Sequence, residues 1–278
     1  MSAGHRLDGI EAVTFDFGNT LVPVDRAGLR RVVERTAERV DARLGPFPAD
    51  GFLEAWGEER ERQFREEVPR FREVDLADRF VRVLARLRGM SPPPPDGRWD
   101  QAGAAMHSTP AEIDAAVEVY SAAFVEVMPA PPAVGPLLER LARRRSLAIL
   151  SNWPLAATID RFVEAAGWAR HFRAIVVSQR VGTIKPHPAI FAAALDAIGG
   201  PPPDRVLHVG DDWVADVVGA KRAGWRAAFL DARPGDSPLP GSVRGTEVEP
   251  DLEIAELGEL ETALARNRGR APAGGAGQ

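Results

Sequence analysis

The sequence predicts an α/β fold, in which a parallel sheet is covered by helices on both faces and an all-helical domain is inserted after the first strand. Two observations support this prediction. From residue 129 onward, short continuous apolar segments alternate with amphipathic ones, as they do when parallel strands are buried between layers of helices. Between residues 25 and 128 there is no strand signal, although an apolar strand at residues 12–16 precedes this stretch. We therefore expect that first strand to join the later ones in one sheet.

The inserted block is predicted to be helical because its apolar residues recur at helical spacing. The expected helices span residues 25–44, 48–67 and 76–87, and a stiff proline loop follows at 92–95. A capping box, Thr109-Pro110-Ala111-Glu112, opens a fourth helix that runs to about residue 127.

Alternating elements fill the rest of the chain. The expected strands are 147–150, 174–177, 205–209 and 226–230, and the expected helices are 133–144, 155–166, 188–198, 214–223 and 252–265. This order assigns residues 1–22 and 129–265 to a Rossmann-like core domain and residues 23–128 to the helical domain. The tail, residues 266–278, is rich in Gly, Ala, Arg and Pro and is expected to be disordered.

The composition limits the classes of function. Hydrophobic residues make up 45% and charged residues 27% of a 278-residue chain, the balance of an ordinary globular protein. The net charge of −5 provides no basic surface, so we expect no nucleic-acid partner. The absence of cysteine excludes disulfides, thiolate catalysis and cysteine metal sites. Neither a signal peptide nor a membrane-spanning segment is indicated, so we expect a cytoplasmic protein, monomeric or homodimeric, with no membrane partner.

The strand at 12–16 ends in a polar turn that contains Asp16, Gly18, Asn19 and Thr20. In an open α/β sheet, ligands bind outside the carboxyl ends of the strands, so Asp16 lies where chemistry takes place. A carboxylate at this position can attack an electrophile or hold a metal ion. Because Asp and Asn are also common turn residues, this segment alone leaves both interpretations open.

Two later segments offer groups that bind anions. Ser151 and Asn152 follow the strand 147–150, where they could hydrogen-bond an anionic oxygen or simply cap the next helix. Lys185 lies just before the helix 188–198 and, with Lys221, is one of only two lysines among 35 basic residues. That scarcity favours a specific role, such as binding phosphate as a point charge, over an ordinary solvated surface lysine.

A cluster of carboxylates, Asp211, Asp212 and Asp216, follows the strand 205–209. These groups would repel one another at the edge of the sheet unless a cation or hydrogen bonds offset their charge. Oxygen ligands of this kind suit Mg²⁺, which takes one or two carboxylates together with a substrate phosphate. Alternatively, Asp211 or Asp212 caps the following helix, and we expect one of the two to do so.

Together these segments resemble the four short motifs of the haloacid dehalogenase superfamily, a phosphatase-rich group. The matching segments, in chain order, are Asp16-x-Gly18-Asn19-Thr20, Ser151, Lys185-Pro186 and Gly210-Asp211-x-x-x-x-Asp216-Val217. Order and spacing agree with the family, and the resemblance covers residues 11–22 and about 133–262. The helical block is similar to the family's small helical cap, which closes over the site and selects the substrate.

The resemblance implies roles for the nucleophile and the metal ligands. Asp16 would attack phosphorus and form an aspartyl-phosphate. Mg²⁺ would be held by Asp16, by the Gly18 carbonyl and by Asp211, with Asp216 in support. The resemblance therefore implies a Mg²⁺-dependent phosphohydrolase that acts on a small phosphorylated metabolite.

The resemblance also implies how the substrate is bound. Ser151 and Lys185 would hold the phosphoryl oxygens and offset the charge that develops in the transition state. Asn152 and Thr20 are further candidate substrate-binding residues. Four residues of the helical block either contact the substrate or form a solvated face: Trp56, Arg60, Arg62 and Arg65.

One position departs from the family's pattern. Most phosphatases of the family carry a second aspartate where this chain has Gly18, and that residue protonates the leaving group and activates water. Dehalogenases of the family have Tyr there and lack the acidic fourth motif, whereas this chain retains Asp211 and Asp216. Phosphonoacetaldehyde hydrolases need a cap lysine, and residues 25–128 contain none. The alternatives to a phosphatase are an inactive member that binds a ligand or partner, and a hydrolase of another carbon–heteroatom bond.

Overall fold

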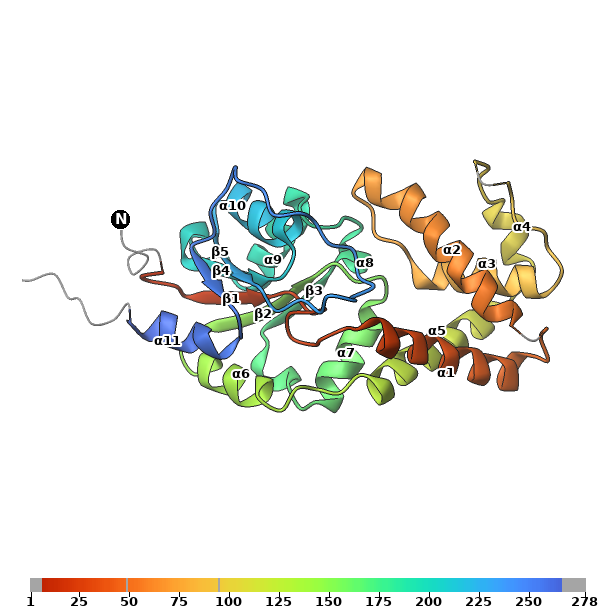
Figure 1. Ribbon diagram of the computed structural model, residues 1–278, viewed down its shortest axis with the longest axis horizontal. Coiled ribbons are helices and arrows are strands. Elements are labelled where there is room, and N and C mark those ends of the chain that lie inside the picture. The colour runs from red at the N-terminus through yellow and green to blue at the C-terminus, as the bar shows by residue number, and fades with distance from the viewer. Residues whose placement is uncertain (1–6, 49, 95, 267–278) are drawn as a thin grey trace, which may run out of the picture.

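The computed structural model describes residues 7–48, 50–94 and 96–266. One twisted sheet forms the centre, helices cover both of its faces, and a group of helices projects from one end (Figure 1). The predicted α/β fold, a parallel sheet with helices on both faces, is confirmed. Among the described residues, no helix is both long and apolar enough to cross a membrane.

The six strands are all parallel and lie in the order β3-β2-β1-β4-β5-β6. Phe15 at the end of β1 pairs in register with Ile149 of β2 and Val209 of β4. The chain leaves β1 toward one side of the sheet and β4 toward the other, and such a reversal creates the crevice in which α/β proteins bind ligands. The strands are β1 (Ala12–Phe15), β2 (Ser146–Ser151), β3 (Ala174–Val177), β4 (Val206–Gly210), β5 (Arg226–Leu230) and β6 (Leu252–Ile254).

Burial on both faces explains why the strands read as continuous apolar runs. Val13 and Phe15 pack with α6 (Val134–Ala142), α7 (Ala156–Ala165) and α11 (Gly258–Arg266). Ala12 belongs to the opposite face, which packs with α9 (Pro188–Ala197) and α10 (Gly219–Arg222). The short helix α8 (Ser178–Val181) follows β3 directly.

The predicted helix at 252–265 is wrong at its start. Residues 252–254 form β6, which extends the sheet beside β5 with Ile254 opposite Leu230, and α11 begins only at Gly258. The large apolar residues of this segment are Leu252, Ile254 and Leu257, and such a spacing is compatible with a short strand or with a helix. Pairing with β5 stabilises the strand at residues 252–254. Arg266 ends α11, and the rest of the tail predicted to be disordered lies outside the described residues.

The projecting helices are α1 (Arg26–Leu44), α2 (Gly51–Glu67), α3 (Leu76–Leu87), α4 (Gln101–Ala105) and α5 (Pro110–Val127), which we call the cap. Asp25 caps α1, and the predicted capping box at Thr109 and Glu112 is present. The short helix α4 had no signal in the sequence. Residues 92–94 of the proline loop have no regular structure, and Pro95 lies outside the described residues.

The cap packs on the carboxyl edge of the sheet through apolar contacts, in which Phe124 of α5 meets Trp153 and Phe162, and through polar contacts. They include backbone hydrogen bonds from Leu76 to Pro154 (3.2 Å) and from Ile184 to Phe71 (3.1 Å). A side-chain contact joins Ser121 of α5 to Thr158 of α7 at 3.1 Å. The cap therefore covers the strand ends that carry the predicted chemistry.

Candidate active site

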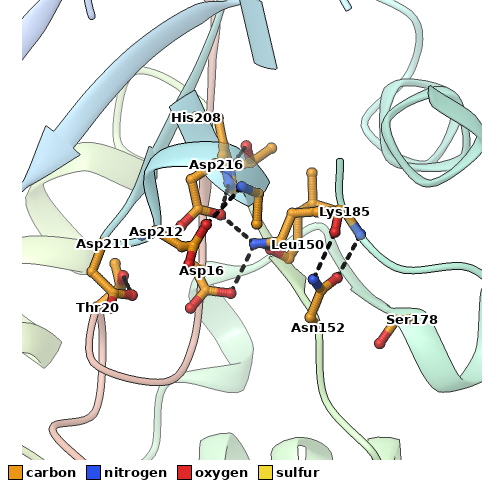
Figure 2. Close-up of polar contacts among 12 residues, drawn as sticks. Asp16, Thr20, Leu150, Asn152, Ser178, Lys185, His208, Asp211, Asp212 and Asp216 are labelled. Atoms are coloured by element: carbon orange, nitrogen blue, oxygen red, sulfur yellow. Dashed lines mark hydrogen bonds and ion pairs between the residues drawn. The ribbon is translucent and has the colours of Figure 1, made fainter. Parts of the chain in front are cut away.

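Three neighbouring strands deliver the predicted site residues to one point. Asp16 follows β1, Asp211 follows β4, and Ser151 is the last residue of β2. The Asp16 backbone N–H donates to the Val209 carbonyl at 2.9 Å, which continues the β1–β4 pairing by one residue. Parallel strands thus place residues far apart in sequence at one edge of the sheet (Figure 2).

Lys185 is the centre of this group. Its Nζ donates to Asp16 Oδ1 at 2.8 Å, to Asp216 Oδ1 at 2.6 Å and to the Leu150 carbonyl at 2.9 Å. Figure 2 shows the ammonium pointing between the two carboxylates. Because the residue is only 2% exposed, the interpretation as a solvated surface lysine is wrong.

Asn152 holds the Lys185 backbone in place. Its side-chain oxygen accepts from the Lys185 N–H at 2.7 Å, and its amide donates to the Lys185 carbonyl at 3.1 Å. It does not cap the next helix, since Leu155 is the residue at the start of α7 and provides no side-chain cap. Both polar groups of Asn152 are therefore engaged with Lys185, and direct contact with a substrate remains a prediction.

Asp216 is aimed at Lys185 by the local backbone. The predicted helix at 214–223 is a π-helical turn, Trp213–Val218, that continues into α10. Asp212 caps this turn by accepting from the Ala215 N–H at 2.7 Å, so the expected aspartate cap is present. The wider turn brings Asp216 back over Gly210, where an added β-carbon would lie 2.2 Å from the Asp216 carboxyl carbon. Short π-helical turns next to α-helices are frequently found at functional sites.

A buried histidine fixes the orientation of Asp216. His208 of β4 lies 3.0 Å from Asp216 Oδ1 through Nε2 and 2.8 Å from the Thr14 hydroxyl through Nδ1. Burial, followed by the charge of Lys185, lowers the pKa of His208, so we assign the neutral ring. Nε2–H then donates to the carboxylate and Nδ1 accepts from Thr14. Sequence analysis missed both residues because inward-facing positions of a buried strand look like ordinary core.

The carboxylates of Asp16, Asp211 and Asp216 are close enough to share one cation. Each offers an oxygen, and these oxygens lie within 4.8 Å of one another. Lys185 and Arg233, which pairs with Asp211, supply two positive charges against three carboxylates, so the cluster keeps a net negative charge when all groups are ionised. Buried oxygen ligands with excess negative charge fit a hard divalent cation.

The pKa values of the three carboxyl groups reflect this excess of negative charge. Burial raises the pKa of Asp16 to about 6, opposed by Lys185 and reinforced by Asp216. Burial and the two neighbouring carboxylates raise the pKa of Asp211 to about 8. For Asp216, burial is outweighed by Lys185 and His208, and its pKa is lowered. A bound cation would add the missing positive charge and lower the pKa values of Asp16 and Asp211.

The three remaining predicted residues, Ser151, Thr20 and Gly18, differ in what they contact. The Ser151 hydroxyl is fully buried beside Asp16, where burial raises the carboxyl pKa and Ser151 is among the groups that lower it, and it makes no other hydrogen bond with a described residue, so it can donate to an oxygen that enters the site. The Thr20 hydroxyl is already engaged, since it donates to Asp211 Oδ1 at 3.3 Å. The predicted metal-binding role of the Gly18 carbonyl remains a prediction.

The loop between β5 and β6, residues 231–251, folds over the same edge of the sheet. Arg233 pairs with Asp211 Oδ2 at 3.1 Å and donates to the carbonyls of Leu239 and Pro240. Ser242 bonds to the capping residue Asp212. This loop could not be identified from the sequence because it has no periodic pattern and no motif.

Leu239 occupies the space beside Gly18. A β-carbon added to Gly18 would lie 2.6 Å from Leu239 Cδ1 and 3.1 Å from Trp153 Cζ3. The place where most family phosphatases have an acidic side chain is therefore filled by apolar groups. The absence of an aspartate at position 18 and the packing of Leu239 against Gly18 therefore go together, because an acidic side chain would need the space that Leu239 fills.

A cavity of about 340 Å³ joins Asp16 to the inside of the cap. Of the cap residues singled out from the sequence, Arg60 lines this cavity, whereas Arg62 is buried inside the cap on the carbonyls of the proline loop. Trp56 lies in the aromatic core of the cap, and neither it nor Arg65 lines this cavity.

Glu73 is a carboxyl on the cap side of this cavity, and no pattern in the sequence selects it. It accepts hydrogen bonds from the Ser178 hydroxyl and from the Val74 N–H at 3.0 Å, so it joins the cap to the residue that follows β3. Burial raises its pKa to about 7, and the two hydrogen bonds oppose this shift only partly.

We predict that Glu73→Gln changes the pH dependence of stability. Because the pKa of Glu73 rises from 4.5 to about 7 on folding, the folded chain binds a proton that the unfolded chain has lost between these values. Stability should fall through this window as pH rises, and glutamine should abolish this contribution. The variant should melt at a higher temperature than the wild type at pH 8 and at nearly the same temperature at pH 5. Thermal melts from pH 5 to pH 8 measure this, with the exposed Glu61→Gln as control. A difference that does not change with pH would contradict it.

Comparison of sequences connects the chain to known hydrolases. Residues 10–224 match the family model for haloacid dehalogenase-like hydrolases. Pyrimidine 5'-nucleotidase YjjG of Escherichia coli is 28% identical over 171 residues, which cover 62% of this chain and 71% of that protein. Phosphoserine phosphatase of Thermus thermophilus is 36% identical over 137 residues, 49% of this chain and 51% of that protein. Ribulose-1,5-bisphosphate 5-phosphatase of Halopiger xanaduensis is 27% identical over 255 residues, 90% of this chain and 97% of that protein.

Solved structures share the fold over nearly the whole chain. A 2-haloacid dehalogenase from Pseudomonas syringae pv. Tomato DC3000 has a TM-score of 0.62 at 26% identity, covering 92% of this chain and 99% of that one. A HAD phosphatase from Thermococcus onnurineus has a TM-score of 0.54 at 21% identity, covering 93% and 99%. Since both a dehalogenase and a phosphatase share the fold, the reaction has to be inferred from the site.

Proposed function

The chain belongs to the haloacid dehalogenase-like hydrolase family, and we propose that it is a Mg²⁺-dependent phosphohydrolase acting on a small phosphorylated metabolite. The observation that carries the proposal is the buried Lys185 ammonium, paired with Asp16 and Asp216 beside a third carboxylate, Asp211. A nucleophile next to a lysine, in a cluster that fits a divalent cation, suits the transfer of a negatively charged phosphoryl group.

The same cluster disfavours dehalogenation. A haloacid substrate carries a carboxylate and releases a halide, so it would add negative charge next to the three carboxylates of the site. It has no phosphoryl oxygens with which to bind the metal ion strongly. A phosphoryl group instead offers oxygens that bind Mg²⁺ directly, together with one or two carboxylates. The phosphatase names among the curated relatives support this choice.

Each site residue has a defined task in the proposed reaction. An Asp16 carboxylate oxygen attacks phosphorus, the bond between phosphorus and the leaving oxygen breaks, and an aspartyl-phosphate forms. The Lys185 ammonium favours the ionised form of Asp16 and stays beside the developing negative charge, while the buried Ser151 hydroxyl donates to a phosphoryl oxygen. Bound by Asp16, Asp211 and Asp216, Mg²⁺ would supply charge neutralisation at the phosphoryl oxygens.

The second half of the reaction is hydrolysis of the aspartyl-phosphate by water, which returns Asp16 to its carboxylate form. In most family phosphatases the second aspartate assists this step and protonates the leaving group. Gly18 has no group for either task. The proposed enzyme should therefore favour substrates whose leaving group carries negative charge well.

Two observations favour a second candidate, a family member that binds a phosphorylated ligand without turning it over. Gly18 removes the general acid, and Arg233 places a fixed positive charge on Asp211. A binding protein would use the same cap and cavity. The two candidates differ in whether phosphate is released.

We predict Mg²⁺-dependent release of phosphate from aryl and acyl phosphates. Asp16→Asn should abolish release while the protein stays folded, because an amide of the same shape cannot attack phosphorus. The measurement is phosphate release with and without Mg²⁺, with circular dichroism to check the fold. If the wild type releases no phosphate above background yet binds the ester, the binding candidate replaces this proposal.

Two neighbouring aspartates, one a proposed metal ligand and the other a helix cap, can be compared by the same substitution. Asp211→Asn should lose Mg²⁺-dependent activity together with the thermal stabilisation by saturating Mg²⁺, which we expect to be about 1–3 kcal/mol in the wild type. Asp212→Asn should keep both, since asparagine is an equally good cap. Equal behaviour of the two variants would argue against the assigned metal ligands.

We predict that restoring a carboxyl at position 18 helps poor leaving groups most. Because Leu239 fills the space, the variant is Gly18→Asp combined with Leu239→Ala, compared with Leu239→Ala alone. General acid catalysis typically contributes about 10²–10⁴-fold, so the kcat/KM ratio of an alkyl to an aryl phosphate should rise by about tenfold or more.

The ratio controls for general damage to the site, because a distorted nucleophile slows both esters together. An unchanged ratio in a folded double variant that still binds Mg²⁺ would show that protonation of the leaving group is not limiting. The single variant Gly18→Asp should be less active than the double one, because the side chain of Leu239 has to be displaced.

A further inference from the structure

The cap side of the cavity is apolar except for a few groups. Its apolar wall comes from Leu29, Phe64, Val68 and Leu76. Arg60 of α2, Arg79 of α3 and Tyr120 of α5 also line it, each from a different helix. These three residues face the same space as Asp16, and the reaction proposed above gives none of them a role.

Arg79 is a buried cation that forms no ion pair with a described residue. It is 4% exposed, its Nε donates to Gln63 Oε1 at 2.9 Å, and its guanidinium lies 5.0 Å from the centre of the Trp56 ring. Among the described residues, no carboxylate pairs with it and no acceptor is bonded to its two terminal nitrogens. Burying a charge in this way is costly unless an anion offsets it.

A neighbouring arginine shows what a purely structural role looks like in this cap. Arg62 is similarly buried, at 7% exposed, but its terminal nitrogens donate to the carbonyls of Pro93, Pro94 and Gly97. Its Nε also lies 3.7 Å from Glu59. The cap therefore satisfies an arginine that it uses for its own structure, and it leaves Arg79 open toward the cavity.

Tyr120 and Arg60 complete the arrangement. Tyr120 is 5% exposed, stacks on Trp56 with ring centres 5.6 Å apart, and has no hydrogen-bond partner for its hydroxyl among the described residues. Burial raises the pKa of Tyr120 to about 12, opposed by the nearby charges of Arg79 and Arg60, so the three groups lie close together. Arg60 donates to the Pro238 carbonyl and forms no ion pair with a described residue.

The nearby Glu73 offsets the charge of Arg79 only in part, because burial lowers the pKa of Arg79 to about 10 and the opposing influence of Tyr120 and Glu73 does not cancel this shift. Its carboxylate accepts from Ser178 and from the Val74 N–H, and it has no ion pair with Arg79. We propose that Arg79, with Tyr120 and Arg60, binds a second anionic group of the substrate, a carboxylate or a second phosphate, while the phosphoryl group meets Asp16. This inference rests on the proposed phosphohydrolase function and names its substrate class: small, doubly anionic phosphate esters with an apolar link.

The cavity volume fits such a molecule. About 340 Å³ is near the lower end of the range of roughly 300–1,000 Å³ for small-molecule pockets. A substrate anchored at both ends would also be held in one orientation across the cavity. The second anion would then supply binding energy remote from the reacting phosphorus.

The test uses aryl phosphates, whose leaving group needs no general acid, with a short alkyl arm on the ring whose far end carries a methyl, a carboxylate or a second phosphate. We expect the wild type to prefer one anionic series over the methyl series by at least about tenfold in kcat/KM. Arg79→Met should reduce kcat/KM for that series by about 10–100-fold, mainly through KM, and leave the methyl series within about twofold. Tyr120→Phe should have a smaller effect in the same direction, and Arg79→Lys should restore part of the loss.

Arg82→Met is the matched control, because Arg82 lies on the same helix and does not line the cavity. It should change no series selectively. Comparison of the carboxylate series with the second-phosphate series identifies which anion the subsite binds. Equal rates for the charged and methyl series, or an equal loss in both series for Arg79→Met, would overturn the inference while hydrolysis itself remained intact.

A binding measurement separates this inference from the proposed reaction. Calorimetric titration of Asp16→Asn with the same esters needs no turnover. Tighter binding of an anionic ester, lost in Asp16→Asn/Arg79→Met, would support the subsite even if the wild type hydrolysed nothing. If the wild type hydrolyses the methyl series and neither anionic ester binds more tightly, only the inference of a second anion fails.

Discussion

The arrangement of the site depends on one buried ammonium. Lys185 joins Asp16, which follows β1, to Asp216 of the π-helical turn and to the end of β2 through three hydrogen bonds of 2.6–2.9 Å. Without it, two buried carboxylates would face each other with no intervening cation, which is among the most destabilising changes a protein interior can undergo. The surrounding structure serves this lysine, since Asn152 fixes its backbone and His208 fixes one of its carboxylate partners. The excess of negative charge that remains is what a divalent cation would offset.

Two parts of the chain, the cap and the β5–β6 loop, cover this charged centre and determine which molecules can reach it. From one side the cap contributes a largely apolar wall with a few buried cations, and from the other the β5–β6 loop contributes Leu239 and Arg233. Arg60 connects these two parts of the chain by donating to the Pro238 carbonyl at 2.8 Å. The loop also explains why a glycine is tolerated at position 18, because Leu239 fills the space that an acidic side chain would need. The cap and the β5–β6 loop therefore determine which leaving groups and which substrates the proposed enzyme favours, while the sheet positions the nucleophile.

The sequence predicted the parts of the site that follow from topology. Asp16, Ser151 and Asp211 lie at strand ends, and a parallel sheet has to bring such residues to one edge. Lys185 stood out because the chain uses arginine almost everywhere else. His208 and Thr14 could not be selected, since polar residues within a buried strand show their role only once their partners are known. Arg79 and Tyr120 lie on helices whose spacing identifies a buried face but cannot tell a cavity wall from packed core. The β5–β6 loop carries neither periodicity nor motif, so its contacts required the folded structure.

The central claim is that Asp16 attacks phosphorus and is then released by water. The most direct test is the stereochemical course at phosphorus, followed with an aryl phosphorothioate made chiral by a heavy oxygen isotope and hydrolysed in water enriched in another. Each in-line displacement inverts phosphorus. Two successive displacements, one by Asp16 and one by water, predict overall retention of configuration. Overall inversion would mean that water attacks the substrate directly, and it would contradict the account.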